Sequence, residues 1–141
     1  MTDSQNDCRE IEAVLNRYAS ALDRKQYDRL SEVFTAGAIA NYVGLAECKG
    51  LDSIRQLISG VLDRCGTTQH LLGNVQIDLK GAEATSSCYL QAIHLGLGDY
   101  AQQVYTVWGE YRDRLVKTAD GWRISYRELE VLHAQGDIGL G

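Results

Sequence analysis

The chain has 141 residues, no proline, 45% hydrophobic residues and a formal net charge of −5, which predicts one domain over residues 1–141 with a single core. Its acidic balance and scattered basic residues disfavour a nucleic-acid surface. No apolar run approaches the roughly 20 residues of a membrane span, and the polar N-terminus is unlike a secretory signal; we therefore expect a cytoplasmic protein with neither membrane nor nucleic-acid partners.

The first predicted element is a helix over residues 6–23. Apolar residues recur through it at helical spacing and form one stripe. Ser4 and Asp7 have the spacing of a capping box ahead of that stripe. Asp23 falls at the edge of the stripe, so its carboxylate is expected either to face inward or to lie at the rim.

The remaining elements divide into a helical part and a strand part. A short helix with Tyr27 and Phe34, a strand over 38–43 and a third helix from Leu51 to a stop at Gly66 come first. Four long strand-like runs follow, separated by turns such as Lys80-Gly81 and Ala119-Asp120-Gly121: residues 68–79, 83–95, 101–117 and 122–133. This order predicts an α+β fold, in which the N-terminal helices pack on the concave face of a curved antiparallel sheet and leave a cavity.

Three residues on separate elements suggest a catalytic site. His70 stands at the head of the first long strand, Asp23 ends the first helix, and Arg127 lies in the last strand. Together they would supply a base, a group that orients it and a cation that receives a leaving anion, which is the equipment for proton abstraction. Taken singly, each has an ordinary structural interpretation: a satisfied histidine, a surface acid and a salt-bridge partner.

Tyrosine hydroxyls are the expected substrate-binding groups. Tyr18 and Tyr42 would donate hydrogen bonds to a carbonyl or leaving oxygen, and Tyr89 is a further candidate. No metal is expected, because the three histidines and four cysteines lack paired ligand spacing. No organic cofactor is expected either, because the glycine-rich stretch near Gly96 joins two strands and does not open a helix.

Several short motifs distributed along the chain carry a family resemblance. They are residues 11–18 ending near Asp23, Phe34, Lys49-Gly50, Thr68-Gln69-His70 with Asn74, Gly109-Glu110-Tyr111 and Gly121-Trp122-Arg123-Ile124. Together they resemble the SnoaL-like branch of the nuclear-transport-factor-2-like superfamily, also called the cystatin-like α+β cone. Within it, the nearest resemblance is to the hexachlorocyclohexane dehydrochlorinase, scytalone dehydratase and bile-acid 7α-dehydratase group.

That resemblance implies roles for individual residues. Asp23 and His70 occupy the places of the family's aspartate–histidine dyad, and Arg127 stands five residues beyond Trp122, as the dehydrochlorinase arginine does. Tyr18 fills a position five residues before the aspartate. The chain departs from the dehydrochlorinase at Thr68, where that enzyme has cysteine, and near Ala40, where it has tryptophan; both positions shape the pocket, so the substrate stays open.

The sequence leaves three functional hypotheses. The first is a cofactor-independent lyase, a dehydratase or dehydrohalogenase, that acts on a mostly apolar and cyclic small molecule. The second is an isomerase or cyclase of the ketosteroid isomerase or polyketide cyclase type, and the third is a non-catalytic binding or subunit module. Apolar residues on both faces of the strand around Trp108 also predict a homodimer or homotrimer.

Overall fold

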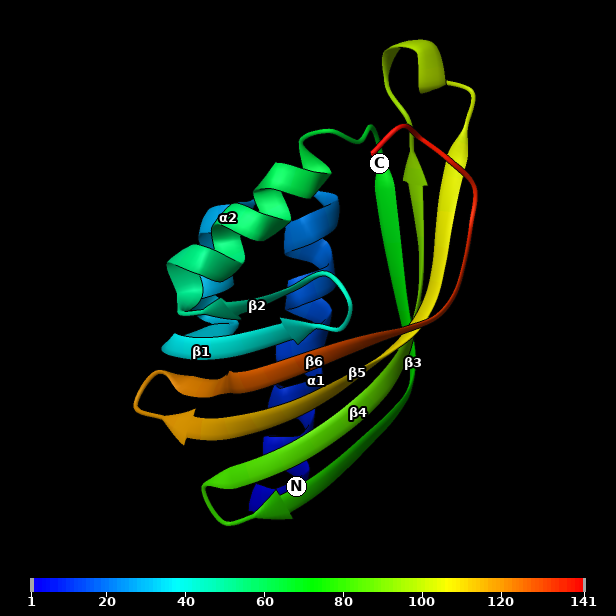
Figure 1. Cartoon of the computed structure of the whole chain (residues 1–141). Helices are drawn as coiled ribbons and strands as arrows, with labels where there is room; N and C mark the ends of the chain where they lie inside the picture. Colours follow the sequence, from blue (N-terminus) through cyan, green and yellow to red (C-terminus); the bar gives the residue numbers. More distant parts are fainter. Residues whose placement is uncertain (1, 141) are drawn as a thin grey trace.

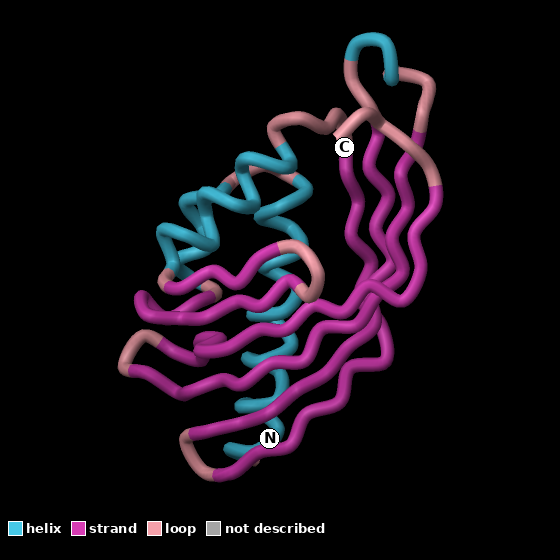
Figure 2. Tube along the Cα trace, viewed as in Figure 1, coloured by secondary structure: helices cyan, strands magenta, loops and turns pink. Residues whose placement is uncertain are grey.

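The computed structural model describes residues 2–140, in which two α-helices lie against one six-stranded sheet (Figures 1 and 2). The sheet order is β2-β1-β6-β5-β4-β3. In chain order the elements are α1 (Asp3–Asp23), the 3₁₀ helix η1 (Tyr27–Glu32), β1 (Phe34–Tyr42), β2 (Ala46–Lys49), α2 (Leu51–Leu62), β3 (Thr68–Lys80), β4 (Glu83–Leu95), the 3₁₀ turn η2 (Gly98–Tyr100), β5 (Val104–Thr118) and β6 (Gly121–Gln135).

The sheet is curved as predicted, but it is mixed and not wholly antiparallel. β1 runs parallel to β6, while every other neighbouring pair is antiparallel. The short strand β2, which the sequence did not indicate, forms a hairpin with β1. With only four residues, β2 is too short to show a clear alternation of apolar and polar side chains.

Helix α1 confirms the predicted apolar stripe, whose members are buried between the helix and the sheet. Its N-terminus corrects the sequence interpretation, because the capping box is formed by Thr2 and Gln5 and not by Ser4 and Asp7. The Thr2 hydroxyl accepts a hydrogen bond from the Gln5 amide at 3.1 Å, and the Gln5 side chain accepts one from the Thr2 amide at 2.9 Å. The helix therefore begins at Asp3, three residues before the predicted start.

The C-terminus of α1 is closed by a left-handed residue. Lys25 has φ = 53°, and the Gln26 amide donates back to the Ala21 carbonyl at 2.8 Å, a helix-ending arrangement more often built on glycine. The Lys25 ammonium group donates to the Cys65 carbonyl at 2.6 Å. This bond ties the end of α1 to the loop that leads into β3, and so it places the last helical residue beside the start of that strand.

Strand β3 forms one edge of the sheet and contains a bulge. Its register with β4 shifts between Gly73 and Gln76, and Asn74 adopts a left-handed conformation there, with φ = 51°. Asparagine is one of the few non-glycine residues that tolerate this conformation. The bulge lies where the sheet bends (Figure 1), so the first part of β3 turns toward the end of α1.

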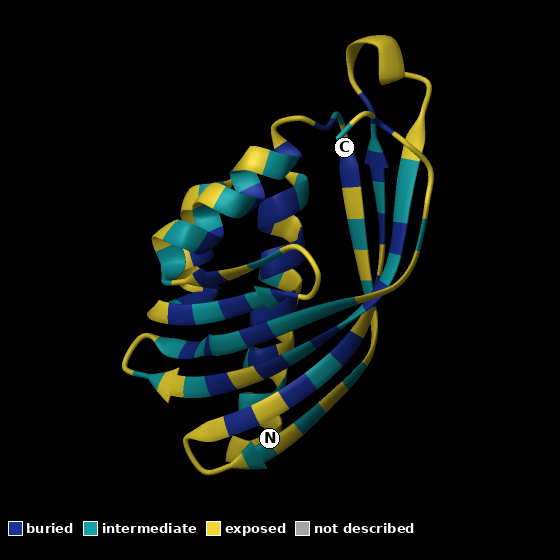
Figure 3. Ribbon diagram, in the orientation of Figure 1, coloured by how far each residue is buried: buried dark blue, intermediate teal, exposed yellow. Residues whose placement is uncertain are grey.

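Buried and exposed residues alternate along the strands (Figure 3), and the buried strand residues form one hydrophobic core with those of the helices. Leu71 and Tyr89 are examples of large side chains on the opposite, outer face, where they are 59% and 52% exposed. The homodimer or homotrimer inferred from apolar residues on both faces remains a prediction. Within residues 2–140, no helix has the length and apolar character needed to cross a bilayer.

Candidate active site

Asp23 and His70 meet at the junction of α1 and β3. The carboxylate accepts three hydrogen bonds there: from Nδ1 of His70 at 2.7 Å, from the His70 backbone amide at 2.9 Å and from the Thr68 hydroxyl at 3.0 Å. Residues 68 and 70 reach it together because side chains two apart in a strand share one face. The backbone amide is available because β3 is an edge strand.

These bonds fix the state of the His70 ring. An ionised carboxylate only accepts hydrogen bonds, so Nδ1 of a neutral His70 carries the proton and Nε2 keeps its lone pair. The His70 side chain is 6% exposed and the Asp23 side chain 21% exposed. The imidazole is therefore largely shielded from solvent, with its basic nitrogen directed away from the carboxylate.

A cavity of about 130 Å³ borders the imidazole. An engineered protein cavity of roughly 150 Å³ holds benzene, so this one fits a small ring. Leucine, isoleucine and valine dominate the wall, and the lining residues that carry polar groups are one histidine and three tyrosines. The lining residues are Tyr18, Leu22, Tyr42, Leu45, Leu57, Ile58, Val61, Leu62, His70, Tyr111 and Leu129.

Two of the tyrosines form a hydroxyl pair in this wall. The oxygens of Tyr18 and Tyr42 are 3.1 Å apart and buried. Burial raises the pKa of both phenols and of Tyr111 above the ordinary value, so all three stay protonated at neutral pH. Within the pair one hydroxyl donates to the other, which leaves one proton for a ligand oxygen.

Arg127, expected to reach a leaving anion, is fully buried and does not line the cavity. It lies behind the wall, with its guanidinium carbon 4.3 Å from the ring centre of Tyr18 and 3.9 Å from that of Tyr111. It makes a two-pronged ion pair with Asp113, from Nε at 2.7 Å and from Nη2 at 2.8 Å. The expectation that Arg127 contacts a ligand directly is therefore corrected, because its guanidinium lies behind the wall of this cavity.

Tyr89 also departs from expectation. It pairs across the sheet with Gly73 and Glu110 and lies 52% exposed on the outer face, because it alternates with the buried residues Cys88 and Leu90. It is not a substrate-binding group of this cavity.

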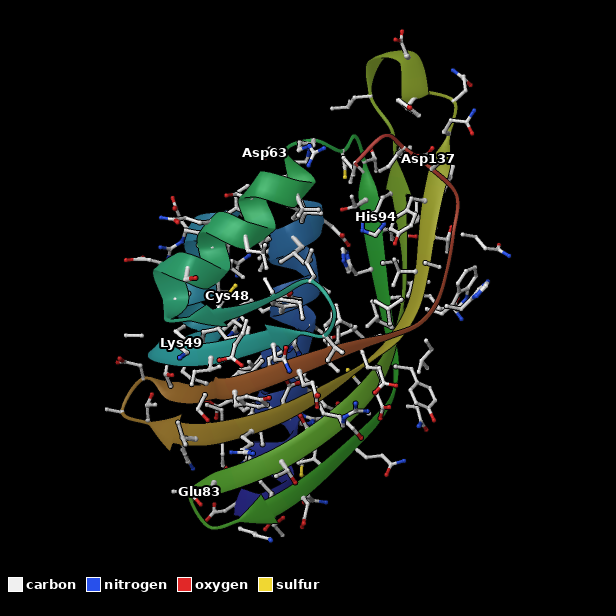
Figure 4. All side chains as sticks on the ribbon, viewed as in Figure 1. Cys48, Lys49, Asp63, Glu83, His94 and Asp137 are labelled. Atoms are coloured by element: carbon white, nitrogen blue, oxygen red, sulfur yellow. The ribbon has the colours of Figure 1, made fainter. Side chains whose placement is uncertain are left out.

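A second histidine, His94, lies on β4 and is labelled in Figure 4. Its ring stands edge-on to that of His70, with ring centres 5.7 Å apart. Nδ1 donates to the Tyr105 carbonyl at 3.1 Å, and burial lowers the pKa of this imidazole. The His94 ring is therefore neutral at neutral pH.

A larger groove of about 450 Å³ lies elsewhere, among charged residues that include Arg112, Arg114 and Glu128. Neither member of the dyad borders it. We place the candidate site in the smaller cavity because a basic nitrogen, hydroxyl donors and an apolar wall occur together there.

The pH dependence of stability should report on Asp23. Burial opposes ionisation of its carboxyl group, but the hydrogen bonds from His70 and Thr68 outweigh that effect and hold its pKa below the ordinary 3.8. A lowered pKa stabilises the folded state above the unfolded-state value, and that contribution is lost as the pH falls through the folded-state value. Asp23→Asn should therefore cost about 1–2 kcal/mol of unfolding free energy near neutral pH, and the difference from wild type should shrink below pH 3.8.

Urea unfolding of both proteins at a series of pH values measures this difference, with Asp137→Asn in the exposed C-terminal segment as the control. A difference that stays constant into strong acid would contradict the hydrogen-bonding account of Asp23.

Comparison with known proteins identifies one family and several solved structures with a similar fold. Residues 3–128 match the profile of the SnoaL-like domain. The uncharacterised protein Rv2910c of Mycobacterium tuberculosis is 35% identical over 124 residues, which cover 86% of this chain and 83% of that protein.

Two solved structures place the fold. A Novosphingobium aromaticivorans protein, provisionally named a scytalone dehydratase, superposes with a TM-score of 0.84 at 24% identity and covers 96% of this chain and 91% of its own. A hexachlorocyclohexane dehydrochlorinase, LinA type 2, superposes with a TM-score of 0.80 at 14% identity, covering 97% and 90%. The two TM-scores show that these proteins share the fold of helices on a curved sheet.

Proposed function

Because the chain belongs to the SnoaL-like domain family, we propose that it is a cofactor-independent enzyme of lyase or isomerase type that removes a carbon-bound proton from a small, mostly apolar molecule. The observation that carries this proposal is the Asp23–His70 pair, whose imidazole borders an apolar cavity. The names of the dehydrochlorinase and of the dehydratase-like neighbour support a lyase among relatives of this fold.

The proposed reaction begins at His70. Its Nε2 takes a proton from carbon, and the electron pair of the broken C–H bond forms a double bond to the neighbouring carbon. As that double bond forms, a hydroxyl on the neighbouring carbon leaves with the electrons of its C–O bond and takes the proton from the His70 imidazolium, so that water is released and the base is restored. Asp23 holds the ring in the required tautomer and stabilises the transient imidazolium.

The cavity favours a dehydratase or an isomerase over a dehydrohalogenase. A departing halide takes no proton and needs a cationic or strongly donating site. Among the described lining residues there is no lysine or arginine, and Arg127 is already paired with Asp113. A hydroxide, in contrast, is neutralised by the proton that His70 has just removed.

The isomerase alternative uses the same residues and differs only in the fate of the proton. The Tyr18–Tyr42 hydroxyl pair favours it as a second candidate, since a hydroxyl pair would hold a substrate oxygen whether or not a group leaves. In that reaction His70 returns its proton to another carbon of the same molecule.

The test compound is 3-hydroxycyclohexanone, a ring of the size that the cavity fits, followed by NMR in heavy water. Formation of cyclohexenone establishes a lyase. Deuterium at the carbon next to the carbonyl without elimination establishes a proton shuttle of the isomerase type. Saturable binding with neither reaction would contradict the enzymatic proposal and favour a binding module. The same NMR measurement is then repeated with a panel of larger cyclic ketones.

Leu45 should govern affinity for apolar ligands. It lines the cavity although it is 67% exposed, so a bound ligand would remove much of its surface from water. Leu45→Ser should weaken binding of nitrobenzene, measured by calorimetry, by roughly fivefold. Leu71→Ser is the matched control, because Leu71 is 59% exposed on the outer face; equal effects of the two substitutions would argue against ligand contact at Leu45.

A further inference from the structure

The buried ion pair behind the cavity wall has no evident reason to lie there. Arg127 and Asp113 are direct partners across β6 and β5, and both side chains are fully buried. Replacing a buried ion pair with apolar residues is often neutral or even stabilising, so stability alone does not explain the pair. One guanidinium nitrogen, Nη1, also has no hydrogen-bond partner in the described structure.

The position of the guanidinium relative to the tyrosines supplies a reason. It lies against the faces of Tyr18 and Tyr111 at 4.3 and 3.9 Å. A cation on the face of a phenol ring stabilises negative charge on that ring and makes its hydroxyl a stronger donor. The hydroxyl of Tyr18 is 3.1 Å from that of Tyr42, and both tyrosines line the cavity that His70 borders.

We propose that Arg127 is a positioning residue whose buried charge supports, through the ring of Tyr18, negative charge on a substrate carbonyl oxygen that accepts the one free proton of the Tyr18–Tyr42 hydroxyl pair. This inference rests on the proposed function and narrows its substrates to carbonyl compounds. When His70 removes a proton from the carbon next to the carbonyl, the C–H electron pair forms a carbon–carbon double bond and the carbonyl π electrons move to the oxygen. The enolate then expels a neighbouring hydroxyl or is reprotonated at another carbon.

The charged and titratable groups around Tyr18 agree with this arrangement. Arg127 on β6 lowers the pKa of the Tyr18 phenol against the raising effect of burial, and Asp113 on β5 raises it to a smaller extent. Tyr42 on β1 and Tyr111 on β5 are the other titratable neighbours. The charge of Arg127 affects Tyr18 more strongly than the charge of Asp113 does, so the ion pair acts on Tyr18 mainly as a cation.

The probe for this role is 4-nitrophenol, whose ionisation is visible by absorbance and whose oxygen mimics an enolate. In the wild type the bound probe should ionise at lower pH than the free probe, so that phenolate binds at least tenfold more tightly than phenol. The measurement is repeated with His70→Ala, which removes any contribution from an imidazolium. Nitrobenzene, which lacks the hydroxyl, reports whether the cavity is intact.

The variants separate a role in charge support from a role in packing. The double variant Asp113→Leu with Arg127→Met should bind nitrobenzene as the wild type does but lose roughly tenfold of its preference for phenolate. Tyr18→Phe should lose that preference while Arg127 is still present. Asp113→Asn should strengthen the preference, a direction that a purely structural role would not produce.

The proposal is overturned if the wild type shows no preference for phenolate, or if the folded double variant keeps the wild-type preference. These outcomes are distinct from failure of the proposed function. If the wild type prefers phenolate but exchanges no proton of the ketone, proton abstraction by His70 is contradicted. The proposed role of Arg127 is then still supported.

Discussion

His70→Ala should lower the rate of deuterium incorporation into 3-hydroxycyclohexanone by about 10²–10⁴, the usual contribution of a positioned base. The substitution removes the imidazole, the only basic side chain among the described residues that line the cavity. It leaves the apolar wall in place, so nitrobenzene affinity should change little. The measurement is NMR of the ketone in heavy water, with circular dichroism to verify the fold.

Asp23→Asn should also slow exchange, by about 10²-fold or more, although it keeps the shape of the side chain. An amide does not stabilise the imidazolium as a carboxylate does, and it no longer selects the tautomer that leaves Nε2 unprotonated. The matched control is His133→Ala, because this histidine is exposed and lies against Trp108. Exchange that survives in either dyad variant would remove that residue from the mechanism.

Arg127→Met should destabilise the fold by about 3–5 kcal/mol, because it leaves the carboxylate of Asp113 buried without its partner. For a chain of this length that corresponds to a fall in melting temperature of roughly 10–15 °C. Adding Asp113→Leu should recover most of the loss, since the second substitution removes the stranded charge.

Arg112→Met provides the control for that experiment. Arg112 also pairs with carboxylates, those of Glu110, Glu128 and Glu130, but its side chain is 40% exposed. Solvent screening limits such pairs to about 1 kcal/mol or less. Thermal unfolding followed by circular dichroism measures all three proteins; comparable losses for the Arg127 and Arg112 variants would mean that burial does not determine the cost.

The sequence predicted the fold well because hydrophobic periodicity is a local property. The stripe of α1, the four long strands and the two strong turns all follow from spacing within a few residues. The pairing of β1 with β6 does not, since the two strands are far apart in the chain and no turn joins them. The parallel pair therefore emerged only from the structure.

Two register shifts make it impossible to tell from spacing alone which site residues share a face of the sheet. Counting back from the turn at Lys80-Gly81 pairs His70 with Ile93, which would put His94 on the opposite face. The bulge at Asn74 shifts the register so that His70 pairs with Ala92, and His94 then joins it on the inner face. A one-residue shift of this kind moves every later side chain across the sheet.

The same effect operates in β6. Trp122 and Arg127 are separated by five residues, an odd interval that sends side chains to opposite faces of a regular strand. The register shift opposite Arg114 and Leu115 brings both inward. The family resemblance gave the correct face for Arg127. Its ion-pair partner, Asp113, could not be identified from spacing.

The hydrogen bond from the His70 amide to Asp23 has a consequence for solubility. An edge strand exposes unpaired amides that recruit strands of other molecules, and proteins protect such edges in several ways. Here the Asp23 carboxylate at the end of α1 accepts the hydrogen bond of the outward-facing His70 amide on the edge strand β3. Position 23 is thus constrained twice, because a substitution that removes its side-chain acceptor would affect both the base and the protection of this edge strand against pairing with another copy of the chain.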